Sequence, residues 1–158
     1  MAAEYSANVA QTVLANQPVI FTESPVPCRR GIVFHRDGSG SFLVASRVPS
    51  YMRNCGCVYE TQYLVTLSGN IAIPTGGTPG SIQLALAVEG EVDPSSIMIA
   101  TPAAVEEYES VSTSIIVSVP SLCGCNSVSV RNISDQSILT QNMNILFEPV
   151  GVQLANRV

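Results

Sequence analysis

Most of this chain consists of short runs in which apolar and polar residues alternate, a pattern typical of strands that bury one face. Residues 81–90 (SIQLALAVEG) show it best, because every second residue from Ile82 to Val88 is large and apolar. Gly- and Pro-rich turns such as PTGGTPGS follow or precede these runs. Similar runs occupy residues 17–23, 31–36, 41–47, 58–67, 96–102, 113–120, 126–134 and 142–150.

No segment shows convincing helical spacing. The best candidate, residues 101–111 (TPAAVEEYESV), does not keep its apolar positions in register for three turns, and β-branched residues follow at once. We interpret it as a loop or the entry to a strand. Strands without alternating helices predict an all-β fold, an antiparallel β-sandwich or barrel of eight to ten strands. No internal repeat or linker indicates a second such domain.

The composition limits the kinds of partner. Only 12% of the residues are charged, against about 25% in a typical soluble domain, while 46% are hydrophobic. A net charge of −5 with seven Lys and Arg argues against a nucleic-acid partner. No apolar run approaches membrane-helix length, so we expect no membrane partner. A chain this poor in charge is expected to bury much of its exterior against other protein.

The sequence lacks recognisable catalytic motifs. There is no nucleophile elbow, and the glycine-rich stretches lack the lysine and helix of a phosphate loop. His35, the single histidine, lies two residues before Asp37, and on an extended strand both side chains would point outward without converging on a pocket. Asn132 to Ser134 match a glycosylation sequon, which we interpret as a turn motif. We therefore expect no enzyme.

Four of the five cysteines form two Cys-Gly-Cys triplets, at Cys55 to Cys57 and at Cys123 to Cys125. The start of the chain lacks the pattern of a secretory signal, so synthesis in a reducing cytosol is expected, where disulfides are uncommon. What the triplets do depends on whether the fold brings them together.

The order of several segments resembles one particular fold. YLVTLSGNIAI (63–73) precedes a Gly/Thr/Pro turn and SIQLALAVEG, and then come TSIIVSVPSLCGCNSVSVRNIS (113–134) and ILTQNMNILFEPVG (138–151). This order resembles the tumour-necrosis-factor/complement-type (TNF-like) jelly roll, in the form found in spore-surface filament heads and in phage virion proteins. The resemblance covers residues 17–151 for the fold, and the whole chain is similar to small structural proteins of phages of gut bacteria.

The resemblance implies about ten strands in two sheets and tight homotrimers around an apolar axis. It implies a virion protein that is made in the host cytoplasm and serves as capsid decoration or as a head-fibre module. Its neighbour would be the major capsid protein or another virion protein. Two further roles fit the same fold: a tip that binds a host receptor or surface glycan, and a spore- or cell-surface filament head.

The resemblance also suggests roles for parts of the chain. Residues 1–16 would be an arm or docking segment, and residues 17–158 the jelly-roll domain. Tyr63, Ile145 and Phe147 are candidates for either the sandwich core or the trimer axis, and the sequence does not separate the two.

In this fold the strand that starts near Val58 lies antiparallel to the strand that ends near Val119, so the triplets would be neighbours. Cys55, Cys57, Cys123 and Cys125 could then hold zinc as a tetrahedral thiolate site, although a single intervening residue is unusual. They could instead form cross-strand disulfides outside the cell, or stay buried as free thiols. No cofactor besides this zinc is expected. Cys28 is left as a free thiol or a contact with another subunit.

Overall fold

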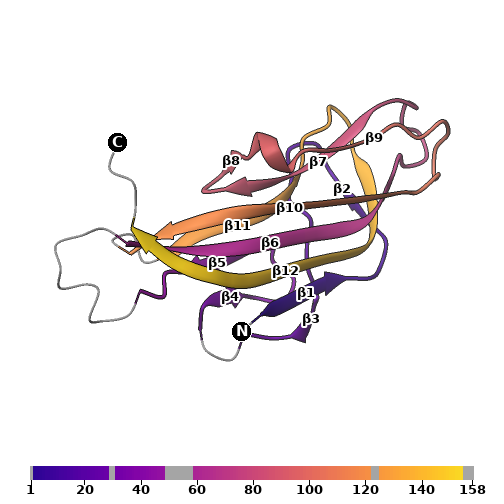
Figure 1. The fold of residues 1–158 in the computed structure, drawn as a ribbon. Helices are drawn as coiled ribbons and strands as arrows, with labels where there is room; N and C mark the ends of the chain where they lie inside the picture. Colours follow the sequence, from indigo (N-terminus) through magenta and orange to yellow (C-terminus); the bar gives the residue numbers. More distant parts are fainter. Residues whose placement is uncertain (1, 29–30, 49–58, 122–124, 155–158) are drawn as a thin grey trace.

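The computed structural model describes residues 2–28, 31–48, 59–121 and 125–154, which form two antiparallel sheets (Figure 1). The first sheet has the order β10 (Glu109–Pro120), β6 (Tyr59–Ala72), β12 (Ile138–Leu154), β1 (Ala3–Ala7) and β3 (Glu23–Val26), with β2 (Gln11–Val13) on β12. The second has the order β4 (Val33–His35), β5 (Ser41–Ala45), β11 (Cys125–Asn132), β7 (Ile82–Val88) and β8 (Glu91–Val92), with β9 (Met98–Ala100) on β7. The predicted antiparallel β-sandwich is confirmed.

The core lies between the sheets and follows the alternation seen in the sequence. Along β6, Tyr63, Val65 and Leu67 are fully buried, whereas the residues between them are partly exposed. β7 departs from simple alternation, because both sides of its central part are buried. The short 3₁₀ turn η1 (Pro94–Ser96) packs beside it, and the Ser96 hydroxyl accepts a hydrogen bond from the backbone of Leu86 at 2.9 Å.

β12 is the central strand of the first sheet. It pairs with β6 on one side and with β1 and β2 on the other. Its register against β6 shifts between Gln141 and Asn144, where Asn142 has a φ of 52°, and again between Pro149 and Gly151. Met143, inside the first shift, lies directly over Gly69 of β6. The two irregularities bend the strand without interrupting the sheet.

The expected N-terminal arm is part of the sandwich, which corrects the domain boundary at residue 17. β1 lies between β12 and β3, with Ala3 opposite Phe147 and Tyr5 opposite Ile145. Ala3 and Tyr5 are buried. Since β1 is five residues long and two of its inward residues are alanines, its alternation is weak and the sequence did not reveal it.

Residues 101–108 connect β9 to β10 without regular structure, as expected for this segment. The part of the chain that the structure describes contains no helix with the length and apolar character needed to cross a membrane.

Candidate functional site

Three of the four triplet cysteines, Cys55, Cys57 and Cys123, lie outside the described residues. The expected strand adjacency does hold, because β10 pairs with β6 and Pro120 stands opposite Glu60. Cys125 is exposed at the start of β11, and Cys28 packs half-buried against the core. Within the described ranges, no group of three or more His, Cys, Asp and Glu side chains is arranged to hold a metal ion. The four-cysteine zinc or disulfide site stays a prediction.

Tyr63, Ile145 and Phe147 are core residues. Each is 0% exposed within a single chain, so none is available to line a trimer axis. The Tyr63 hydroxyl donates a 2.6 Å hydrogen bond to the carbonyl of Ala45, which joins the first sheet to the second. Burial disfavours the charged phenolate and raises the pKa of Tyr63 to about 12.

His35 does not point outward as expected. Its ring stacks on buried Phe42, with centroids 4.3 Å apart, and meets the edge of Tyr5 at 5.0 Å. Its Nδ1 lies 3.0 Å from the Ser41 carbonyl oxygen and its Nε2 lies 3.2 Å from that of Phe21. Because Val33 and His35 face inward, Phe34 between them faces outward. Three consecutive apolar residues at 32–34 left this orientation undetermined in the sequence. His35 is therefore a structural side chain at the edge of the core.

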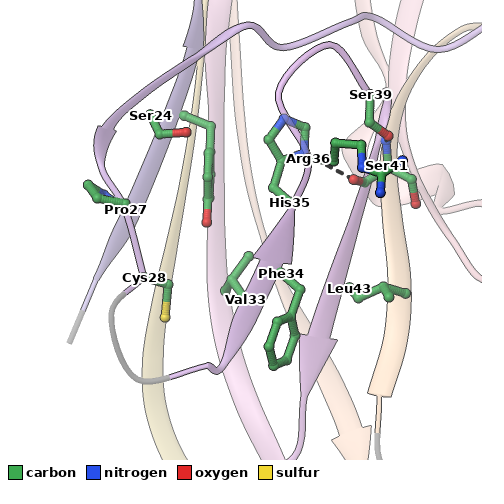
Figure 2. Close-up of a pocket in the computed structure, with 11 residues that line it drawn as sticks. Ser24, Pro27, Cys28, Val33, Phe34, His35, Arg36, Ser39, Ser41 and Leu43 are labelled. Carbon is green, nitrogen blue, oxygen red and sulfur yellow. Dashed lines mark hydrogen bonds between the residues drawn. The ribbon is translucent and has the colours of Figure 1, made fainter.

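A hollow of about 670 Å³ lies where edge strands β3 and β4 of the two sheets approach each other (Figure 2). We call it the β4 hollow. Ser24, Pro27 and Cys28 line it from the β3 side, while Phe34 and Arg36 line it from β4 and the turn that follows. The hollow could not be predicted from the sequence, because the sequence does not determine which residues of β4 point outward.

The outer surface of β6 and β10 carries no charge over five successive residue pairs. We call this surface the neutral face; it consists of outward residues that are Ser, Thr, Asn, Gln, Leu or Ile. They are Gln62, Leu64, Thr66, Ser68 and Asn70 of β6 and Ser110, Ser112, Ser114, Ile116 and Ser118 of β10.

The polar groups of the neutral face partly satisfy one another. Ser110 donates to the side-chain oxygen of Asn70 at 2.8 Å, and the hydroxyls of Thr66 and Ser114 lie 3.1 Å apart. Ile116, which is 49% exposed, stands opposite Leu64. Hydroxyls that are already paired cost less to remove from water, so this surface can be buried against protein at a modest penalty.

β10 is also an edge strand. It pairs with β6 over its whole length without a register shift, and no other described strand pairs with its second side. Edge strands are commonly protected by charged residues, prolines or bulges. Between Glu109 and Pro120, β10 has none of these. Among the described residues, β10 thus presents a long edge that no strand pairs with, beside the neutral face.

Comparison with known proteins agrees with this architecture. No family model matches the chain, and no curated protein sequence matches it. Among solved structures it is similar to Eiger TNF from S. frugiperda, with a TM-score of 0.66 and 11% identity over 100% of this chain and 98% of that one. It is also similar to the globular domain of zebrafish complement 1qA, with a TM-score of 0.51 and 14% identity over 99% and 98%. At these identities the likeness concerns the fold, and the chain has the predicted TNF-like jelly roll.

Proposed function

We propose that this chain is a non-enzymatic structural protein of a phage particle. In this proposal it forms a jelly-roll homotrimer that decorates the capsid or builds part of a head fibre. The major capsid protein or another virion protein is its neighbour in the particle. The proposal rests on the whole-chain resemblance to phage structural proteins, on the fold and on the uncharged outer surface of β6 and β10.

The observation that carries the self-association is the neutral face with its β10 edge. A sheet edge of this length exposes a row of backbone donors and acceptors that invites pairing or coverage. When one surface of a subunit contacts a different surface of the next identical subunit, the copies form a closed ring if the rotation between neighbours divides a full turn evenly. In such a ring every subunit has both contact surfaces covered. A surface that lacks charge loses little solvation when a neighbouring copy covers it. Together these features favour a closed ring of copies.

The mass in solution tests the trimer. The monomer has a mass of 16.7 kDa, so sedimentation at micromolar concentration should give about three times that value. Ile116→Lys would place an unpaired charge in the buried contact and should shift the protein toward monomer, weakening assembly more than tenfold. Leu43→Lys is the matched control, since Leu43 is 43% exposed on a strand of the second sheet.

A wild-type protein that sediments as a monomer at micromolar concentration would refute the trimer. Equal effects of Ile116→Lys and Leu43→Lys would refute the neutral face as the contact.

The place in a virion is tested on particles. Phage particles purified on a density gradient from cells that carry this gene should contain the chain, in copy numbers that are multiples of three. A cryo-EM reconstruction should show it as a protrusion with threefold symmetry on the particle surface. Absence of the chain from infectious particles would exclude the structural role, whatever its oligomeric state.

A further inference from the structure

A second hollow adjoins the β4 hollow on the outer side of the second sheet. We call it the β11 hollow; it has a volume of about 290 Å³ and lies over β5 and β11. Ser127, Ser129 and Arg131 line it from β11. Ser39 and Ser41 line both hollows, so the two form one connected surface.

Arginines are the charged side chains that line this surface. The described residues include three arginines, and two of them, Arg36 and Arg131, line the hollows. The chain has twelve Asp and Glu residues, yet none lines either hollow. Two carboxylates, Asp37 and Glu89, lie beside the surface on its serines, but in a protein of net charge −5 a connected surface lined by two arginines is still suited to an anionic ligand.

The nearby carboxylates already have partners. Asp37 accepts a 3.1 Å hydrogen bond from the Ser24 hydroxyl, and Glu89 accepts one from the backbone N–H of Ser127. Arg131 donates through Nη1 to the Gly90 carbonyl at 3.2 Å, while its buried Nε has no hydrogen-bond partner. Neither Arg36 nor Arg131 has an ion pair among the described residues, so both guanidinium groups keep donors for a ligand.

The rest of the surface combines hydroxyl groups with an exposed ring. Serines 24, 39, 41, 127 and 129 contribute side-chain hydroxyls, which can donate and accept hydrogen bonds. Phe34 is 53% exposed and stands opposite Leu43, so the two contribute apolar surface to the β4 hollow (Figure 2). An inorganic anion would use the arginines and leave this apolar surface and most hydroxyls unused. A sugar ring has hydroxyl edges and apolar C–H faces that match both.

We propose that the connected β4 and β11 hollows bind an acidic oligosaccharide that bears carboxylate groups. Arg36 and Arg131 bind the carboxylates, the serines bind sugar hydroxyls, and Phe34 with Leu43 packs against a ring face. This inference goes beyond the structural role, since it gives the outer side of the sandwich a ligand, and it does not depend on the trimer.

Calorimetric titration with a tetramer of galacturonic acid tests the proposal, with the methyl-esterified tetramer as the neutral control on the same sugar backbone. We expect the acid to bind at least tenfold more tightly than the ester, and its affinity to fall as salt rises. Arg36→Gln and Arg131→Gln should each weaken binding of the acid about tenfold. Phe34→Ala should weaken binding of the acid and leave its salt dependence unchanged.

Arg47→Gln is the matched control, because Arg47 lines neither hollow. Arg36→Gln is the cleanest variant, since the Arg36 side chain makes no hydrogen bond or ion pair within the described chain. A thermal melt of each variant checks the fold, and sedimentation of the same samples reports assembly separately from binding.

Four results would overturn the proposal. They are absence of binding of the acid at millimolar concentration, equal binding of acid and ester, equal losses for Arg47→Gln and Arg36→Gln, and complete displacement of the tetramer by an equal concentration of inorganic phosphate. If binding fails while the protein sediments as a trimer, the proposed structural role stands and this inference falls.

Discussion

At the scale of single residues, Tyr63 connects the two layers of the sandwich. Its ring fills the core, and its hydroxyl bonds the Ala45 carbonyl of the opposite sheet. Burial raises the pKa from the ordinary value of 10.0 to about 12. In the unfolded chain the phenol ionises near pH 10, so unfolding releases a proton between pH 10 and pH 12. Stability contributed by the neutral phenol is therefore complete below pH 10 and is lost as pH rises toward 12.

Replacing Tyr63 by Phe tests this coupling. At pH 7 the change should lower the free energy of unfolding by about 1–2 kcal/mol, because the Ala45 carbonyl loses its buried donor. Between pH 10 and pH 12 the variant should lose less stability than the wild type. Urea denaturation across this pH range measures both effects, with Tyr108→Phe as the control because Tyr108 is 37% exposed. Parallel pH profiles of wild type and Tyr63→Phe would contradict the assignment.

At the scale of secondary-structure elements, the irregular register of β12 depends on a glycine in its neighbour. A Cβ built on Gly69 would overlap the Met143 sulfur and lie 3.1 Å from the Met143 Cα. Gly151, at the second register shift, has no atom within 4 Å of such a Cβ. The same substitution thus meets backbone at one irregularity and open space at the other.

Gly69→Ala should lower the free energy of unfolding by about 1–3 kcal/mol through overpacking, whereas Gly151→Ala should change it by less than about 0.5 kcal/mol. Thermal or urea denaturation of the two variants side by side measures the difference. Comparable losses in both would mean that the close approach of β6 and β12 at Met143 is not what makes Gly69 necessary.

The strands whose inward residues are large could be predicted from the sequence. Residues 81–90 and 113–120 became β7 and the second half of β10, because Ile, Leu and Val at every second position predict a strand with an apolar face toward the core, although β7 also buries Ala85 and Ala87 on its other side. β1 was not predicted because two of its buried residues are alanines, which give only a weak alternation of apolar and polar residues. The inward orientation of His35 could not be predicted because residues 32–34, which precede it, are all apolar and do not indicate which face of the strand is buried. The hollows and the neutral face depend on which distant strands become neighbours, and local patterns do not contain that information.

At the scale of the whole molecule, the first residues hold the sandwich together. Removing residues 2–8 would delete β1 and uncover Ile145 and Phe147 on β12. We expect the truncated chain to lose cooperative thermal unfolding, and Tyr5→Ala in the full chain to cost about 3–5 kcal/mol. Circular dichroism melts measure both. A truncated protein with an unchanged melting temperature would restore the view of this segment as a separate arm.

The central position of β12 has a consequence for biosynthesis. β1 leaves the ribosome first among the described strands and β12 last, yet each needs the other to complete its hydrogen bonds. Until β12 has emerged, β1, β2 and β6 all lack the same neighbouring strand. The first sheet therefore closes after translation of all the other strands, and the nascent chain exposes apolar strands throughout its synthesis.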